Sequence, residues 1–289
     1  MRSKNVLAVI VLLALGGTAD AADCDRSCLE GLLTQYVDAV VSHDSSKLPV
    51  AGQVRFTEDG KDLALAAGQL WKSVTGKPIF RQDYLDVRQQ VAAAHVQFPE
   101  AGTQALHTVL LHVRDRRITG IETQVQRITP DARFQPDGSL TKGMPGLADP
   151  VPQGKAMPRA QMIRTALTYT EGLRIGNFTT GKTPFAKQAY RVENGMFIAG
   201  VGCPRKECAG LYDQKIMLHP DVKASVAAVD EQNGLVLLWM NFGDTGSYGP
   251  GNALVTYEAF KVWGGEIQVI NAFFRTQPKE TQRGWPSAD

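Results

Sequence analysis

The stretch Ala253–Arg275 constrains the fold of this chain most strongly, because it predicts both a hairpin and its register. Two runs of mainly apolar residues flank Gly264-Gly265, and paired glycines supply the positive φ angles that a two-residue hairpin turn needs. Counting outward from this turn places Glu258 directly opposite Asn271. Because side chains alternate along a strand, we expect both residues on one apolar face of the sheet. That face would also carry Thr256, Phe260, Val262, Ile267, Val269 and Phe273.

Two segments of the chain are similar in sequence to two later segments. Arg117–Arg127, RITGIETQVQR, aligns with Glu266–Arg275, EIQVINAFFR, and this alignment matches Glu122 with Asn271. A second similarity is found between Phe56–Gly60, FTEDG, and Tyr190–Gly195, YRVENG. Internal similarity of this kind indicates a repeated structural unit. We therefore expect two tandem units of the same fold.

Each unit is predicted to start with a helix and to continue as antiparallel strands, which is an α+β arrangement. Ser27–Ser42 has apolar residues at helical spacing, and a second helical pattern begins at Pro158 and stops at Gly176-Asn177. The intervening stretch is rich in proline and glycine and cannot form a core of its own. We divide the chain into residues 1–21, a first unit 22–128, a linker 129–157 and a second unit 158–289.

Residues 1–21 are typical of a secretory signal peptide. Arg2 and Lys4 precede the apolar run Val6–Leu15, and Ala19-Asp20-Ala21 forms a small-x-small cleavage site. The apolar run is shorter than the roughly 18 residues that a membrane helix needs. We therefore expect a periplasmic or secreted protein that has no membrane contact after cleavage.

The four cysteines fit an oxidising compartment. Cys24, Cys28, Cys203 and Cys208 allow three pairings, of which we favour the two local ones, Cys24–Cys28 and Cys203–Cys208. Two cysteines four apart in a regular helix are too widely separated for a disulfide, so Cys24 should precede the helix. A zinc site is the alternative, and the lack of a histidine near the second pair argues against it.

Composition and motifs exclude several functional classes. The formal net charge is +2 and no long basic block occurs, so nucleic acid is not an expected partner. The sequence contains no GxSxG elbow, HExxH, P-loop or dinucleotide-binding glycine pattern. We expect no metal and no cofactor, and we leave homo-oligomerisation open. Apolar residues make up 43% of the chain, which is enough for each unit to form a hydrophobic core.

The sequence of the first unit resembles the sequences of secreted bacterial and fungal proteins of the nuclear-transport-factor-2-like, or SnoaL-like, superfamily. The resemblance rests on FTEDG, GQLW and RITGIETQVQR in the first unit, and on Val229–Val236, Tyr257–Val262 and Gly284-Trp285 in the second. It implies two tandem cones, each a helix packed on a curved antiparallel sheet with a small-molecule pocket between them. Members of this superfamily carry out isomerisation, dehydration, cyclisation or plain binding, so the fold does not choose a reaction.

Glu258 and Asn271 are the candidate catalytic residues of the second unit. A carboxylate on an apolar wall has a raised pKa, which suits general acid–base chemistry near neutral pH. Thr256, Phe260 and Phe273 would line the same pocket. The alternative is a buried, hydrogen-bonded Glu–Asn pair that only stabilises the sheet.

His107 and Glu122 are the candidate catalytic residues of the first unit. If Asp115-Arg116 is a two-residue turn, Gln124 lies opposite His107 and all three polar side chains share one face. A histidine beside a glutamate has the outline of a general-base pair. Tyr36, Trp71 and Tyr84 are candidate ligand-lining residues, although aromatic side chains at such positions more often belong to the core.

Three functions remain open from the sequence. The first is a cofactor-independent lyase or isomerase that transfers a proton on a small organic molecule. The second is a non-catalytic exported protein that binds a small hydrophobic ligand. The third is a structural pairing of filled cones, in which each unit buries the apolar face of the other.

Overall fold

The computed structural model describes residues 23–205, 208–214 and 216–289. The predicted signal peptide lies outside these residues. The first unit comprises α1 (Arg26–Val41), the 3₁₀-helix η1 (Ser45–Lys47), β1 (Val50–Glu58), β2 (Lys61–Leu63), α2 (Leu70–Ser73), β3 (Phe80–Asp86), β4 (Val91–Glu100), β5 (Thr103–Arg114) and β6 (Arg117–Ile128). The second comprises α3 (Arg159–Ile175), β7 (Phe185–Glu193), β8 (Met196–Gly200), β9 (Lys223–Asp230), β10 (Leu235–Asn241), β11 (Asn252–Trp263) and β12 (Glu266–Pro278).

The strands form two six-stranded sheets whose strand orders correspond element by element. The first runs β2-β1-β6-β5-β4-β3 and the second runs β8-β7-β12-β11-β10-β9. Each sheet is accompanied by one long helix, which confirms the α+β class and fits two tandem cones. One pairing in each sheet departs from the expected antiparallel arrangement, because β1 lies parallel to β6 and β7 lies parallel to β12.

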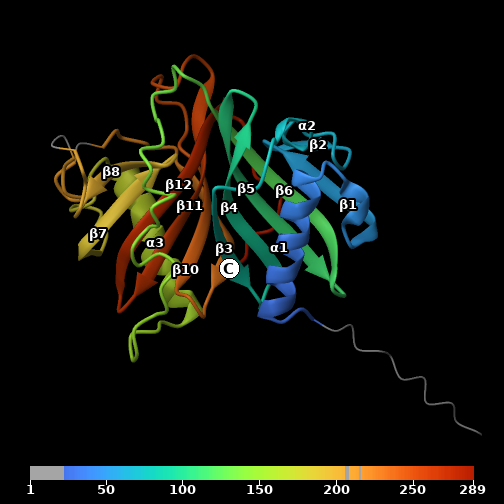
Figure 1. The fold of residues 1–289 in the computed structure, drawn as a ribbon. Coiled ribbons are helices and arrows are strands. Elements are labelled where there is room, and N and C mark those ends of the chain that lie inside the picture. The colour runs from blue at the N-terminus through green and yellow to red at the C-terminus, as the bar shows by residue number, and fades with distance from the viewer. Residues whose placement is uncertain (1–22, 206–207, 215) are drawn as a thin grey trace, which may run out of the picture.

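Two helices and two sheets stack in four layers. One apolar cluster joins α1 to the first sheet, and a second joins α3 to the second sheet. A third cluster draws on both sheets, so their outer faces pack against each other. Figure 1 shows the sheets side by side in the centre of the molecule, with α1 lying across the first. Each strand near the centre is therefore buried on both faces, which accounts for its nearly continuous apolar sequence.

The helices begin and end where local chemistry predicts. The carboxylate of Asp25 accepts a hydrogen bond from the backbone N–H of Cys28 and caps α1. The apolar stripe of α1, which includes Leu29, Leu33 and Tyr36, is buried against the first sheet. Helix α3 ends at Gly176, whose φ of 76° is the left-handed conformation that glycine adopts without strain.

Both two-residue turns form as predicted, but the register beyond them is shifted. Trp263 pairs with Glu266 and Val262 with Ile267, and then Lys261 pairs with Val269, so that β12 contains one extra residue. The predicted pairing of Glu258 with Asn271 is therefore wrong: Glu258 lies opposite Ala272. Because a slip of one residue turns a side chain to the other face, Glu258 faces α3 and Asn271 faces the first sheet.

The first hairpin carries the same β-bulge. Val113 pairs with Ile118 and His112 with Gly120, so Thr119 is the extra residue. Gln124 therefore lies opposite Thr108 rather than His107, and the predicted sharing of one face is wrong. His107 points toward α1, while Glu122 and Gln124 point toward the second sheet.

Both local disulfides, Cys24–Cys28 and Cys203–Cys208, are present, and the described residues contain no free cysteine. Cys24 precedes α1, as predicted. The linker has no core of its own but lies against the second unit, where Leu140, Met144 and Leu147 are buried in the cluster between the sheets. Among the described residues, no helix combines the length and hydropathy needed to span a membrane.

Candidate functional site

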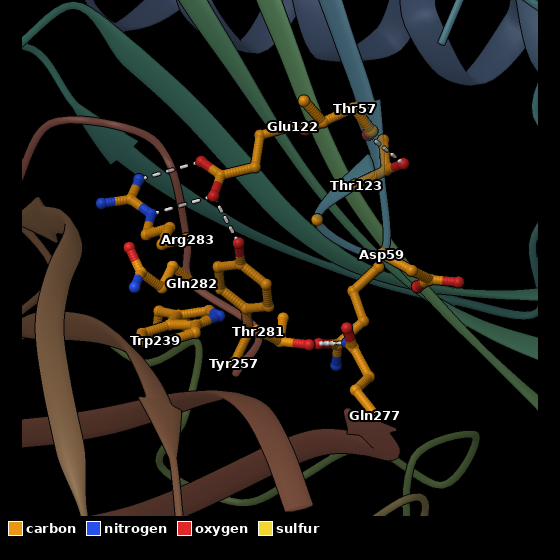
Figure 2. Close-up of a pocket in the computed structure, with 12 residues that line it drawn as sticks. Thr57, Asp59, Glu122, Thr123, Trp239, Tyr257, Gln277, Thr281, Gln282 and Arg283 are labelled. Atoms are coloured by element: carbon orange, nitrogen blue, oxygen red, sulfur yellow. Dashed lines mark hydrogen bonds and ion pairs between the residues drawn. The ribbon is translucent and has the colours of Figure 1, made fainter. Parts of the chain in front are cut away.

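Glu122 stands at the centre of a polar cluster between the two sheets. Arg283, from the segment after β12, donates from Nε to Oε1 and from Nη2 to Oε2, each over 2.9 Å. The hydroxyl of Tyr257 on β11 donates to Oε1 over 2.5 Å, and Nε2 of His112 lies 3.4 Å from Oε2. Figure 2 shows Glu122 facing Arg283 and Tyr257 across a narrow space. The cluster therefore joins β6 of the first unit to two segments of the second.

The electrostatics of this cluster favour an ionised carboxylate. Burial by itself would raise the pKa of Glu122, but the hydrogen bond from His112 and the contacts with Arg283 and Tyr257 lower it overall. The cavity beside it has a volume of about 10 Å³, which is room for about one water molecule. A fully paired carboxylate without space for a substrate is suited to holding the two units together rather than to proton transfer.

Gln124 also reaches the second unit. Its Nε2 donates to the backbone oxygen of Phe273, and its Oε1 accepts from Nε2 of Gln277, each over 3.1 Å. The structure therefore brings the predicted residues Glu122 and Gln124 to one place. Sequence reasoning missed Arg283, the partner of Glu122, which follows the last strand and shows no local pattern.

His107 lies in the first cone with two predicted aromatic residues. Its Nε2 is 3.1 Å from the hydroxyl of Tyr36, and the ring of Trp71 meets the ring of Tyr36 edge-on at 5.6 Å. Burial lowers the pKa of His107 to about 3, so the ring is neutral near pH 7. These three side chains are tightly packed and form part of the core.

Asn271 and Phe273 meet Tyr84 around His95, between the sheets. Nδ2 of Asn271 lies 3.1 Å and the hydroxyl of Tyr84 lies 3.0 Å from Nδ1 of His95, and the ring of Phe273 stacks on the imidazole at 4.3 Å. Burial lowers the pKa of His95 to about 3. From the sequence, His95 had no identifiable partner. Of its two partners, Tyr84 is 11 residues away and Asn271 is 176 residues away, so no local signal could have found the contact with Asn271.

Glu258 lies in the second cone, beside Tyr169 of α3 and Arg191 of β7. Its side chain is buried, and Oε1 has no hydrogen-bond partner among the described residues. Burial raises the pKa of Glu258 to about 8, while the charge of Arg191 partly opposes the shift. The guanidinium of Arg191 donates from Nη1 to the hydroxyl of Tyr169 over 2.9 Å and from Nη2 to Gln214 over 2.7 Å. The cluster therefore combines the carboxyl group of Glu258, whose pKa is about 8, with the hydroxyl of Tyr169 and the guanidinium of Arg191.

The other predicted pocket residues of the second unit divide between the two faces. Phe260 lies in the cluster under α3 with the ring of Tyr169, at 5.1 Å between centroids. Thr256 is buried and donates to the backbone oxygen of Phe273 over 3.2 Å. The described residues contain no group of three or more His, Cys, Asp or Glu side chains placed to hold a metal ion.

Comparisons with known proteins give a family match for part of the chain. The model of a family described as "Domain of unknown function (DUF8021)" matches residues 155–274, which include α3 and β7 to β11 and most of β12. No curated protein matches the chain. Among solved structures, one match is a protein titled "putative ketosteroid isomerase" from Kribbella flavida, with 17% identity and a TM-score of 0.28, over 39% of this chain and 85% of that chain. A likeness of this size gives no information about activity.

Proposed function

We propose that the second unit binds a small organic molecule and transfers a proton with Glu258 as the acid–base group, as a cofactor-independent isomerase or lyase does. The observation that carries this proposal is the carboxyl group of Glu258, which is buried and has a pKa raised to about 8, and whose Oε1 has no hydrogen-bond partner in the part of the chain that the structure describes. Strongly perturbed carboxyl groups of this kind gather at functional sites. A base with a pKa near the working pH is also the most effective in proton transfer.

The neighbours of Glu258 supply the complementary roles. In the proposed step, the carboxylate removes a proton from a carbon next to a carbonyl group, and the electron pair moves onto the carbonyl oxygen. The hydroxyl of Tyr169 accepts from Nη1 of Arg191 over 2.9 Å and also interacts with the carboxyl group of Glu258, and in the proposed step it turns to donate to that oxygen. The protonated Glu258 then returns the proton to a different carbon, which completes an isomerisation. Alternatively, the enolate re-forms the carbonyl group and expels a leaving group with its bonding electron pair, and Glu258 gives the proton to that leaving group, which completes an elimination.

A cavity near this cluster offers a route for the substrate. It has a volume of about 320 Å³, and its walls include Phe185, Leu211 and Tyr212. Phe185 and Leu211 belong to the same apolar cluster as Tyr169. Gln214 connects this wall to the cluster, because its Nε2 donates to the backbone oxygen of Leu211 over 2.9 Å and its Oε1 accepts from Nη2 of Arg191 over 2.7 Å. The proposal therefore requires a substrate to replace the contact between Gln214 and Arg191.

Proton transfer is testable before the substrate is known. The purified protein is incubated in deuterated buffer with a panel of small ketones and enones, and carbon-bound deuterium is measured by NMR. We expect exchange with the wild type, loss of exchange in Glu258→Gln and unchanged exchange in Glu266→Gln, an exposed residue at the hairpin turn. Exchange that persists in Glu258→Gln would exclude Glu258 as the acid–base group.

A structural role is the second candidate, and one observation favours it. The outer faces of the two sheets bury each other in a shared apolar cluster, so the central strands of both sheets are closed to a ligand on that face. If the wild type exchanges no carbon-bound proton with any member of the panel, and no member of it raises the melting temperature, this second candidate is favoured.

The disulfides support function outside the cytoplasm. Cys24–Cys28 and Cys203–Cys208 are both formed, and such bonds persist in oxidising compartments. We propose that the mature chain is periplasmic or secreted. Cell fractionation of the source organism should place it outside the cytoplasm, and recovery in the cytoplasmic fraction with reduced thiols would contradict this.

A further inference from the structure

A second, larger cavity lies where the linker crosses the outer face of β7 and β8. Its volume is about 600 Å³, which is within the range of small-molecule sites in proteins. Its apolar wall is formed by Met144, Pro145, Tyr190, Val192, Phe197 and Val201. This face of the second sheet belongs to the cluster between the sheets, and the linker covers it here. None of these residues takes part in the Glu258 cluster.

The walls of this cavity are held in place by bonds between the linker and the sheet. The hydroxyl of Tyr190 donates to the backbone oxygen of Pro145 over 2.8 Å. The carboxylate of Asp137 accepts from the backbone N–H of Phe197 over 2.9 Å. The rings of Tyr190 and Phe197 stack with 5.1 Å between centroids, which gives the wall a flat aromatic surface. The cavity is therefore formed before any ligand binds.

Among the described residues, the charges at the rim leave one cation without an ion-pair partner. Asp137 accepts hydrogen bonds from Ser139 as well as Phe197, and the charge of Arg205 further favours its ionised form, so the charges of Asp137 and Arg205 offset each other. Lys142 lines the cavity, is exposed and forms no ion pair with any described residue. Val201, which is 51% exposed, leaves apolar surface open at the same rim.

We propose that this cavity, lined by the linker and by β7 and β8, binds a small, flat, apolar molecule that carries one anionic group. The apolar body lies against the wall formed by Tyr190, Phe197 and Val201, where burial of apolar surface drives binding. The anionic group lies next to Lys142, whose charge sets the preference for an acid over a neutral molecule. The site is independent of the proton-transfer function proposed for Glu258.

Two fluorescent probes test this proposal on the full mature chain. Anilinonaphthalene sulfonate is a flat aromatic anion, and phenylnaphthylamine is a neutral molecule of similar shape. We expect saturable binding of both, with the sulfonate bound more tightly at low salt and the preference reduced as salt screens the charge of Lys142. Far- and near-ultraviolet circular dichroism establishes that each variant is folded. A wild-type protein that binds neither probe overturns the proposal.

Three variants assign the binding to this cavity. Pro145→Asp places a charge on a part of the apolar wall that lines this cavity alone, and it should weaken binding of both probes by about tenfold or more, which corresponds to roughly 1.4 kcal/mol. Lys142→Glu should weaken binding of the sulfonate several-fold and leave the neutral probe unchanged. Lys77→Glu, an exposed lysine of the first unit, is the charge-matched control and should bind both probes as the wild type does. Equal binding by wild type and Pro145→Asp would place the probes elsewhere, and an unchanged sulfonate affinity in Lys142→Glu would overturn the anionic class.

Discussion

Arg283 and Glu122 are 161 residues apart in the sequence, and they meet in a two-pronged ion pair buried between the sheets. Nε and Nη2 of the guanidinium each lie 2.9 Å from a different carboxylate oxygen. The same guanidinium donates from Nη1 to the backbone oxygen of Val226 on β9 over 3.0 Å. The segment after β12 therefore ties β6 of one unit to β9 of the other.

Arg283→Met should destabilise the protein strongly. The methionine retains much of the apolar stem but leaves Glu122 buried without its cation, and an uncompensated buried charge costs roughly 3–5 kcal/mol. Urea unfolding at neutral pH measures the loss. The double variant Glu122→Gln with Arg283→Met should recover part of it, because the stranded charge is gone. Lys279→Met, which breaks the exposed pair with Asp244, should change the free energy of unfolding little. An equal loss of stability in Lys279→Met and in Arg283→Met would contradict the interpretation.

Gly120→Ala should displace Trp285. The indole ring stacks on His112 with 4.2 Å between centroids, and a Cβ at position 120 would overlap the far edge of that ring. We expect a loss of roughly 1–3 kcal/mol, the usual cost of overpacking. The indole N–H signal of Trp285 should also move in the NMR spectrum, because its 3.1 Å bond to Thr57 is broken. Gly52→Ala, where a Cβ meets no atom within 4 Å, is the matched control, and an unmoved Trp285 signal would refute the prediction.

Glu258 should make the stability of the protein depend on pH. Its pKa is raised from 4.5 to about 8 in the folded state, so the folded protein holds a proton that the unfolded chain has lost. The resulting stabilisation is complete below about pH 4.5 and is lost as the pH rises through 8. We expect the stability difference between wild type and Glu258→Gln to change by a few kcal/mol between pH 5 and pH 9, in the direction that disfavours the wild type at high pH. A difference that stays constant over this range would mean that Glu258 does not change its charge.

His107 should act in the opposite direction, at lower pH. Burial lowers its pKa from 6.5 to about 3, so the folded state excludes a proton that the unfolded chain accepts. Its contribution to stability is complete above about pH 6.5 and is lost as the pH falls toward 3. Relative to His107→Gln, the wild type should lose up to about 1.4 kcal/mol per pH unit in this interval. In the folded protein the imidazole C–H signals of His107 should remain unshifted down to pH 5, and titration near pH 6.5 would contradict its burial as a neutral ring.

Much of the secondary structure follows from short-range chemistry. The turns at Asp115-Arg116 and Gly264-Gly265, the cap at Asp25 and the helix end at Gly176 each depend on a few neighbouring residues. Both disulfides join cysteines only four and five positions apart, so proximity along the chain was enough to predict them. The internal sequence similarity also predicted two units of the same fold, and the two sheets have corresponding strand orders.

The sequence by itself therefore determined the turns, the helices, most of the strands and the disulfides of this protein, because a few adjacent residues decide each of them. Only the tertiary structure decided which faces the side chains of the candidate site residues take. One extra residue, Thr119 in β6 and Gln268 in β12, reverses the alternation beyond each turn and separates Glu258 from Asn271. The partners then come from distant segments, such as Tyr169 for Glu258 and Arg283 for Glu122. Packing of whole sheets and helices selects these contacts, and no pattern of neighbouring residues records that packing.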